Sequence, residues 1–273
     1  MKQGALLAKG RTAEVYLWGD SQVLKLFYDW CPQDWVRRET DVAKTISQTD
    51  MPAPKCFGTV TVDSRAGIVF QKVEGPSLLS LMTSNPGRIS RYARMMADLH
   101  IQMHKNDART LLPLRRWLTR CIQEAEPLPG DLRDFAGGIL EELPDGRALC
   151  HFDFHPDQII MSKEGPIVLD WMTAFQGDPL ADVARTSILL TMARTDHLKW
   201  LTRVMVGLGR RLMHSSYRAQ YLRQKGNGSL GAIEKWMIPI AAARLNEKIT
   251  GEEEALIHFL RDSQKRFVGG QHL

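Results

Sequence analysis

The residues of this sequence that are best suited to chemistry lie in one short polar segment. Its polar side chains include His151, Asp153, His155 and Gln158. A further acid, Asp170, stands at the end of the next apolar stretch. Carboxylate and amide oxygens are the ligands that Mg²⁺ prefers in proteins, and an additional carboxylate can act as a base or orient a proton. The grouping therefore indicates a site that holds a divalent cation and moves a proton.

Two short apolar stretches must position these side chains. Residues 158–161 and 166–169 have the length and composition of strands, and a turn separates them. A loop, strand, turn and strand of this length can fold back as a hairpin. We expect that hairpin to bring Asp153 and Asp170 to one end. A surface loop whose acids cap helices is the alternative interpretation.

The order of residues in the polar segment resembles a known catalytic loop. The chain reads His-Phe-Asp-Phe-His-Pro-Asp-Gln from His151, and a later strand ends in Asp-Trp at Asp170. This is similar to the catalytic loop and metal-binding acid of protein-kinase-like enzymes, in the aminoglycoside phosphotransferase and choline kinase branch. The resemblance implies that Asp153 accepts or orients a substrate hydroxyl proton and that Asp170 holds Mg²⁺ at the nucleotide phosphates. Gln158 stands where the family carries Asn, and its amide oxygen implies a metal ligand.

Other residues in and after this segment have structural or supporting roles. His151 is expected to brace the loop or to be a satisfied structural histidine. His155 is compatible with a structural or a substrate-facing role, and both remain open. The later Gly-Asp-Pro segment is similar to one that follows the metal-binding acid in the family. Asp178 should cap a helix that has Pro179 in its first turn, and Asp182 should brace the catalytic loop.

Lys25 lies in an apolar strand, where a charged side chain needs a partner. Strand alternation places Lys25 on the same face as Val23 and Phe27. The following helix offers Glu39, which is centred on that helix's apolar face. An ion pair between Lys25 and Glu39 is therefore expected, and it matches the Lys–Glu pair that positions phosphates in kinases. An exposed edge-strand position for Lys25 is the alternative.

The resemblance also implies the remaining nucleotide-binding parts. The stretch Gly-Arg-Thr-Ala-Glu-Val-Tyr from Gly10 is similar to the family's phosphate-binding loop, where small residues keep the backbone thin. Residues 68–78 resemble the hinge between the two lobes. There the adenine would hydrogen-bond backbone groups near Gln71 and Val73, and Phe70 would form one wall of the pocket.

Acids and histidines outside these motifs are weaker candidates for a binding role. Asp196 and the acids at 252–254 could attract a cationic substrate, but glutamates also suit helix N-termini because of the helix dipole. His100 and His104 are one helical turn apart, a spacing that can bind a metal. No glutamate lies between them at the position that metalloproteases require, so a packing or a surface role is expected.

The elements around the motifs divide the chain into two parts. We expect an α+β, bilobal protein-kinase-like fold. Residues 1–74 would form a small N-terminal antiparallel β lobe with one helix, which binds the nucleotide. Residues 75–273 would form a larger, mostly α C-terminal lobe for catalysis and substrate binding, since apolar residues there recur with a helical period. The expected helices are 34–48, 88–105, 110–126, 131–143 and 178–195, and the expected strands of the first lobe are 4–8, 13–18, 23–27, 56–62 and 67–73.

Composition excludes several classes of protein. The chain has 273 residues, of which 44% are hydrophobic and 25% charged, so it is neither disordered nor fibrous. The net charge of +5 is spread evenly, so no nucleic-acid partner is expected. The four cysteines form no CxxC pair, and neither a secretory signal nor a membrane-spanning apolar run is visible. We therefore expect a cytoplasmic protein with no membrane partner.

These observations predict an ATP-dependent phosphotransferase. It would move the γ-phosphoryl group, with Mg²⁺, to a hydroxyl group of a small molecule such as an aminoglycoside-like compound, an amino alcohol or a sugar. Two alternatives stay open. A nucleotide-binding pseudokinase acting as an interaction module would account for Gln158 and the missing loop glycines. A protein kinase would require a regulated activation segment, and the chain lacks the Ala-Pro-Glu sequence that normally ends one.

Overall fold

The structure is a computed structural model, and it describes residues 3–192, 200–226 and 229–268. The contacts within the chain divide it into two compact units. The first comprises Met1–Leu81 and Pro156–Ala174, and the second comprises Met82–His155 and Phe175–Leu273. The boundary predicted after Glu74 is not tested by this division and stays a prediction. The inclusion of the segment 156–174 in the first unit was not predicted, because sequence order does not show which unit a returning segment joins.

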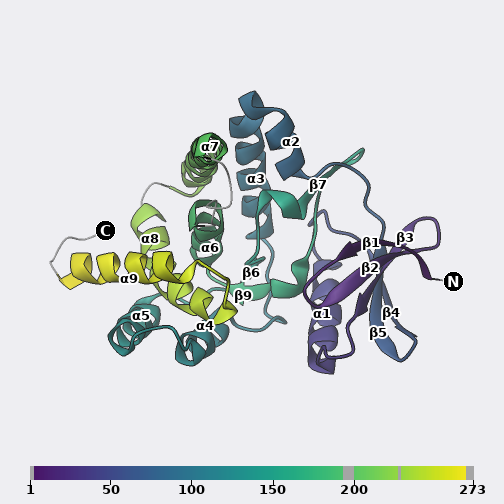
Figure 1. The fold of residues 1–273 in the computed structure, drawn as a ribbon, viewed down its shortest axis with the longest axis horizontal. Coiled ribbons are helices and arrows are strands. Elements are labelled where there is room, and N and C mark those ends of the chain that lie inside the picture. The colour runs from purple at the N-terminus through teal and green to yellow at the C-terminus, as the bar shows by residue number, and fades with distance from the viewer. Residues whose placement is uncertain (1–2, 193–199, 227–228, 269–273) are drawn as a thin grey trace. The chain divides into compact units, whose positions relative to one another are not determined.

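The first unit is built on an antiparallel five-stranded sheet with the strand order β1-β2-β3-β5-β4 (Figure 1). Its strands are β1 (Gln3–Lys9), β2 (Ala13–Trp18), β3 (Gln22–Phe27), β4 (Cys56–Val62) and β5 (Arg65–Gln71). Asp63 and Ser64 have positive φ values of 47° and 66°, the conformation of a tight hairpin turn between β4 and β5. The strands expected over 56–62 and 67–73 are thus present as the hairpin β4–β5.

Helix α1 (Gln33–Ile46) covers one face of this sheet, because its apolar stripe and one set of alternating strand residues are buried together. Val36 of the helix packs with Ala13, Phe27 and Ile68 of the strands. The opposite face has a separate core of Leu24, Leu26 and Val69. Alternation along β3 therefore places Lys25 on the helix-covered face. The helix begins after Pro32, so Asp34 lies in its first turn.

The hairpin β7 (Ile159–Ser162) and β8 (Gly165–Val168) also belongs to the first unit. The chain after β5 lies against it, since the Met161 N–H donates to the Pro76 carbonyl at 2.9 Å. Gly75 has a φ of +147°, and a Cβ there would lie 2.2 Å from the Met161 carbonyl oxygen. Only glycine fits this crossing. Helix α2 (Leu78–Ser84) follows and was not predicted.

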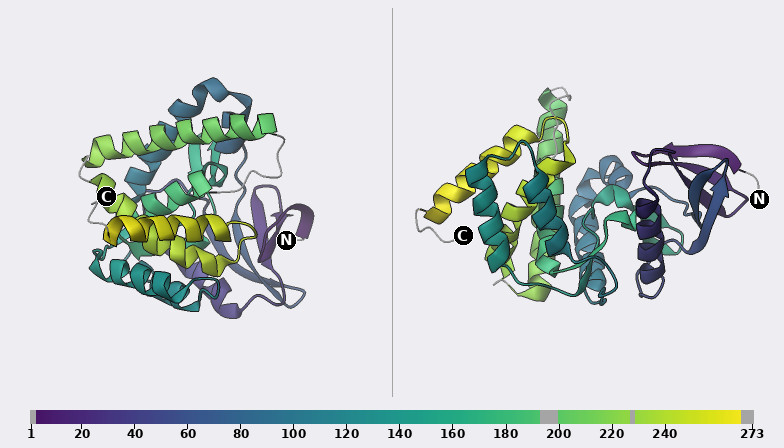
Figure 2. Two further views of the ribbon diagram at one scale, coloured as in Figure 1. Left: turned by 60° about the vertical axis from the view of Figure 1, so that its left-hand side comes forward. Right: turned by 90° about the horizontal axis from the view of Figure 1, so that it is seen from below.

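The second unit is mostly helical. Its helices are α3 (Ile89–Met103), α4 (Leu114–Glu124), α5 (Gly130–Glu142), α6 (Pro179–Met192), α7 (Trp200–Lys225), α8 (Ser229–Arg244) and α9 (Glu253–Val268). Helices α3 and α7 lie side by side, as do α6 and α8 (Figures 1 and 2). The short strands β6 (Ala148–Cys150) and β9 (Phe175–Gly177) pair antiparallel. No helix in the described residues is long and apolar enough to cross a membrane.

The predicted helices exist, but one of them is shorter than expected. The helix expected over 110–126 is limited to Leu114–Glu124, because Pro113 precedes its first turn and Ala125 is extended. The strands β6 and β9 were not predicted, since three residues are too few to show a period. The predicted cap of α6 is confirmed: the Asp178 side chain accepts a hydrogen bond from the Leu180 N–H at 2.7 Å.

Candidate active site

Three charged side chains meet in the first unit. Lys25 Nζ lies 2.7 Å from Glu39 Oε1 and 3.5 Å from Asp170 Oδ1. Lys25 comes from the helix-covered face of β3, Glu39 from the buried face of α1, and Asp170 from the end of the β7–β8 hairpin. The Lys25–Glu39 ion pair that the two apolar faces predict is therefore present. The role of the pair in nucleotide binding stays a prediction.

The protonation of this cluster reflects a balance between burial and charge. Burial alone would lower the pKa of Lys25, but the carboxylates of Glu39 and Asp170 more than offset it and raise that pKa above its usual value. Lys25 is therefore a cation at neutral pH. Burial raises the pKa of Glu39, and the Lys25 charge opposes this effect. A fixed ammonium group of this kind can neutralise a phosphate oxygen.

Asp170 occupies a strained backbone position directly after β8. Its φ and ψ are 54° and 60°, in the left-handed region that a residue with a Cβ rarely adopts. The turn that follows is held by Trp171, whose indole N–H donates to the Val168 carbonyl at 2.9 Å. The Asp170 side chain is 44% exposed. The hairpin thus presents a carboxylate to solvent beside Lys25.

Gln158 lies at the same end of the hairpin as Asp170. The register pairs Ile159 with Val168, and the Leu169 N–H donates to the Gln158 carbonyl at 2.8 Å. The amide group therefore directly precedes β7, and the carboxylate follows its partner strand β8 by two residues. Oxygen donors of this kind fit a hard divalent cation such as Mg²⁺.

In the second unit, Asp153 lies in a loop that Asp182 holds from α6. The Asp182 carboxylate accepts hydrogen bonds from the N–H groups of His151 at 2.6 Å and Phe152 at 2.8 Å. Phe152 has a positive φ of 64°, a conformation that these two bonds help to maintain. His151 is fully buried, and its Nδ1 accepts the Asp153 N–H at 3.3 Å. The expected bracing by Asp182 and His151 is thus present.

Two further side chains of α6 contact the same loop. Arg185 Nε donates to the Phe152 carbonyl at 3.1 Å, and Thr186 Oγ1 donates to the Phe154 carbonyl at 3.0 Å. With Asp182, these residues have the i, i+3 and i+4 spacing of one helix face. Arg185 Nη2 also pairs with Glu247 Oε1 at 2.7 Å. The backbone from 151 to 154 is therefore fixed by four hydrogen bonds from three side chains of a single helix.

His100 and His104 support Asp182 from α3. The Nε2 atoms of His100 and His104 lie 2.9 and 3.4 Å from Asp182 Oδ2. Their Nδ1 atoms hydrogen-bond the hydroxyl groups of Tyr217 at 2.6 Å and Tyr221 at 2.8 Å on α7. The three residues could hold a metal ion by composition, but their ligand atoms already contact one another, two tyrosines and the backbone of the loop that carries Asp153. Both histidines are buried, so packing is the one of the two expected roles that the structure confirms.

Burial controls the protonation of this cluster. It lowers the pKa of His104 to about 4, and the neighbouring His100 contributes in the same direction. Burial works against the charged form of Asp182, but the two histidines more than offset it and hold the pKa of Asp182 far below its usual value. At neutral pH, Asp182 is thus an anion that can accept hydrogen bonds from the loop.

The comparisons with known proteins identify the family of this chain. A model of the phosphotransferase enzyme family (APH) matches residues 4–219. The chain belongs to this family. Among curated proteins, no sequence matches the chain.

Solved structures show that the family's kinase-like fold is shared. A ternary complex of APH(2")-IIa with streptomycin and ATP is 13% identical, with a TM-score of 0.58 over 94% of this chain and 90% of that chain. Macrolide 2'-phosphotransferase MphH from Brachybacterium faecium is 19% identical, with a TM-score of 0.56 over 94% and 91%. APH(3'')-Id from Streptomyces rimosus, with ADP and streptomycin, is 18% identical, with a TM-score of 0.51 over 84% and 90%. The predicted α+β, protein-kinase-like fold is confirmed.

The expected nucleotide-binding loop and hinge of this phosphotransferase differ in the hydrogen bonds that their backbone groups form. The Gly10 N–H donates to the Ala13 carbonyl at 2.8 Å and closes the turn between β1 and β2. The N–H groups of Gln71 and Lys72 donate to neighbouring carbonyls. Within the described residues, the Val73 backbone makes no hydrogen bond. The expected contact of Gln71 and Val73 with a base stays a prediction.

The acids considered as binding groups for a cationic substrate differ in burial and in their partners. Glu252 is buried, and its two carboxylate oxygens accept hydrogen bonds from Arg244 at 2.6 and 3.0 Å. It is therefore committed to the fold. Glu253 and Glu254 are exposed in the first turn of α9, where the helix dipole favours them. Asp196 lies outside the described residues.

Sequence reasoning missed the contribution of Arg185 and Thr186. Their positions three and four residues after Asp182, on the same face of the expected helix, are the signal that could have revealed them. His155 remains open, since its Nε2 is 3.8 Å from Asp153 Oδ2 and both side chains are 30% exposed.

Proposed function

We propose that this phosphotransferase transfers the γ-phosphoryl group of ATP to a hydroxyl group of a small molecule. The observation that carries the proposal is the contact of Lys25 with both Glu39 and Asp170. A buried cation oriented by one acid and placed beside a partly exposed second acid suits a polyphosphate and its counter-ion. The resemblance of the segment 151–158 to the family's catalytic loop supports the choice of reaction.

Asp170 and Gln158 would hold Mg²⁺ in this proposal. The bound ion would neutralise charge that develops on the phosphates. Lys25 would contact phosphate oxygens, and Glu39 would keep its ammonium group in place. The hinge residues Gln71 and Val73 would receive the adenine, while the turn at Gly10 would lie near the phosphates. These assignments rest on the family resemblance together with the geometry of the first unit.

Asp153 would act on the acceptor. Its carboxylate would orient the acceptor hydroxyl group and take its proton as the oxygen forms a bond to the γ-phosphorus. The bond between that phosphorus and the β–γ bridging oxygen would break, and ADP would leave. Asp182, Arg185 and Thr186 fix the loop backbone. Asp153 would therefore be held in position before the acceptor binds.

The acceptor class follows from the family and its structural neighbours. The neighbours are described as phosphotransferases of aminoglycosides and of a macrolide, and some are complexes with streptomycin or gentamicin. We propose an acceptor of comparable kind, a polyhydroxylated small molecule such as an aminoglycoside-like compound, an amino alcohol or a sugar.

The test is a phosphotransfer screen with radiolabelled ATP and Mg²⁺ over aminoglycosides, macrolides, choline, amino alcohols and sugars. We expect at least one acceptor to be labelled, and Asp153→Asn to reduce labelling by about a thousandfold or more. Asp157→Asn is the matched control, because Asp157 is an exposed acid in the same segment. ATP binding with no turnover on any acceptor would favour a pseudokinase. Labelling of proteins but of no small alcohol would favour a protein kinase.

A further inference from the structure

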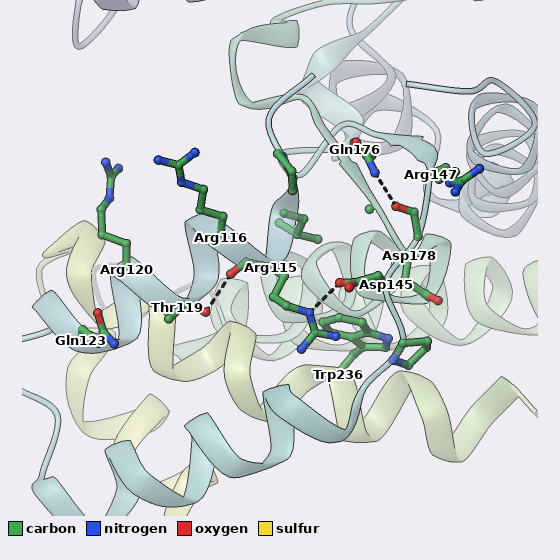
Figure 3. A pocket seen from close by; sticks show the side chains of 15 residues that line it. Arg115, Arg116, Thr119, Arg120, Gln123, Asp145, Arg147, Gln176, Asp178 and Trp236 are labelled. Carbon is green, nitrogen blue, oxygen red and sulfur yellow. Dashed lines mark hydrogen bonds and ion pairs between the residues drawn. The ribbon is translucent and has the colours of Figure 1, made fainter. Parts of the chain in front are cut away.

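A cavity of about 830 Å³ lies within the second unit (Figure 3). It is formed by α4, the segment that joins α5 to β6, and the end of β9. The cavity residues 144–147 precede β6, whereas the loop that carries Asp153 follows that strand. The cavity thus adjoins the other end of β6. Its volume is in the range of sites that hold small molecules, about 300–1,000 Å³.

The acidic side chains of this cavity are already paired. Asp145 Oδ1 accepts a hydrogen bond from Arg115 Nε at 2.6 Å. The other guanidinium nitrogens of Arg115 donate to the carbonyl groups of Leu140 and Leu143. Asp178 accepts the Leu180 N–H as the cap of α6. Both carboxylates therefore already have protein partners, and the Arg115 contacts tie α4 to the end of α5.

The floor of the cavity is held by backbone. A Cβ at Gly146 would lie 2.1 Å from the Gly177 carbonyl oxygen, so the two segments cross too closely for any other residue. Gln176 Nε2 donates to the Gly146 carbonyl at 3.1 Å. These contacts make the cavity a preformed feature, in which a ligand would not have to order the wall.

The charged side chains of the cavity that have no close partner are arginines. Within the described residues, the side chains of Arg116 and Arg147 form no hydrogen bond or ion pair. Arg120 reaches Glu124 only at 3.8 Å, with both side chains exposed. In Figure 3, Arg116 and Arg120 extend from α4 in the same direction, and Arg147 lies on the opposite side of the view. Like charges one helical turn apart repel each other, so an anion between them would relieve that repulsion.

A buried donor also adjoins this cavity. Trp236 lines the cavity and is only 2% exposed, and its indole N–H has no hydrogen-bond partner among the residues that the structure describes. A buried N–H without an acceptor is unfavourable and uncommon in folded proteins. That N–H is enclosed by protein atoms, so Trp236 contributes part of its ring to the cavity wall and no donor to a ligand.

We propose that this cavity binds a small molecule that carries two or more phosphate groups. Guanidinium groups bind phosphate oxygens in pairs, with a geometry that matches their planar fork. Arg116 and Arg120 are about 6 Å apart at their Cβ atoms, a spacing that suits neighbouring phosphates. Together with Arg147, they offer more donors than a single carboxylate can accept.

Calorimetric titration with inorganic pyrophosphate tests this proposal. The full chain is first saturated with ADP and Mg²⁺, so that the proposed nucleotide site is filled. We expect saturable binding of pyrophosphate that weakens as salt is raised. Arg116→Gln/Arg120→Gln should raise the Kd at least about tenfold, and Arg147→Gln should raise it by a smaller factor. Citrate, a polycarboxylate, is titrated in parallel and should bind more weakly than pyrophosphate.

Two control variants make the outcome decisive. Arg91→Gln/Arg94→Gln removes two exposed arginines from α3, outside the cavity, and should leave the Kd unchanged. Lys25→Met/Glu39→Leu, which removes both charges of the ion pair, should also leave the Kd unchanged, because the proposed nucleotide site is not involved. The proposal is overturned if pyrophosphate does not bind, if Arg116→Gln/Arg120→Gln binds it as the unmodified protein does, or if Lys25→Met/Glu39→Leu folds but does not bind it. Stronger binding of citrate would instead assign the cavity to carboxylates.

Discussion

Lys25 Nζ donates a hydrogen bond to Glu39 Oε1 at 2.7 Å, across the boundary between β3 and α1. Glu39 is 5% exposed, and its second carboxylate oxygen is buried without a hydrogen-bond partner among the described residues. Glu39 is therefore oriented mainly by Lys25, and Lys25 in turn is held beside Asp170. The pair ties the position of a cation to the packing of the helix on the sheet.

Lys25→Ala should lower kcat/KM for ATP by about a hundredfold or more, because a fixed charge at the phosphates is lost. It should also lower the free energy of unfolding by about 3–5 kcal/mol, since Glu39 is left as an unpaired buried acid. Steady-state kinetics and urea unfolding measure the two effects. Lys44→Ala is the control, because Lys44 is an exposed lysine of α1, the helix that carries Glu39.

The double variant Lys25→Met/Glu39→Leu separates activity from stability. Removal of both charges should restore most of the lost stability, because no unpaired charge remains, while activity should stay low. Recovery of activity together with stability would show that Lys25 matters only for folding.

Asp170→Asn should reduce Mg²⁺-dependent turnover by about a thousandfold or more, because an amide is a much weaker ligand for a hard cation than a carboxylate. Turnover measured over a range of Mg²⁺ concentrations tests this expectation. Asp63→Asn is a matched control, since Asp63 also has a positive φ and lies in an exposed turn. Asparagine tolerates this conformation, so neither variant should unfold. Full activity of Asp170→Asn would remove Asp170 from the proposed metal site.

Gln158→Asn should keep activity within about threefold of the unmodified protein or raise it. Asparagine retains the amide oxygen that we propose as a metal ligand and is the residue usual at this position in the family. The apparent affinity for Mg²⁺ and kcat are the quantities to compare. Complete loss of activity would mean that the longer side chain has a different function.

The protein should lose stability as the pH falls from about 6.5 to about 4. The pKa of His104 in the folded protein is about 4, whereas the unfolded value is near 6.5. Between these values the unfolded state binds more protons, so the free energy of unfolding rises with pH and falls on acidification. The contribution of His104 is about 3 kcal/mol. The pKa of His214 is also lowered to about 4 by burial, which adds a change of the same sign.

Urea unfolding at several pH values measures this dependence. His104→Gln should reduce the slope of unfolding free energy against pH between 4 and 6.5, whatever its effect on stability at pH 7. His258→Gln is the control, because His258 is an exposed histidine whose side chain is 79% accessible, and it should leave the slope unchanged. An identical slope in His104→Gln and the unmodified protein would contradict the low pKa of His104.

Local patterns in the sequence were sufficient for much of the first unit. Alternation along β3 and the apolar stripe of α1 predicted that Lys25 and Glu39 face each other, because both periods report which side of an element is buried. The two strands after residue 158 are joined by a short turn, so their pairing and the proximity of Gln158 to Asp170 could also be predicted. In each case the interacting residues belong to neighbouring elements.

Tertiary structure alone decided what supports Asp153. Asp182 was expected to brace the loop, but its own neighbours His100 and His104, and their partners Tyr217 and Tyr221, come from distant helices. The rows of apolar residues on α3 and α7 show that each helix is buried, but not which other helix it meets or in what register. That choice depends on how side chains far apart in the chain fill a common core.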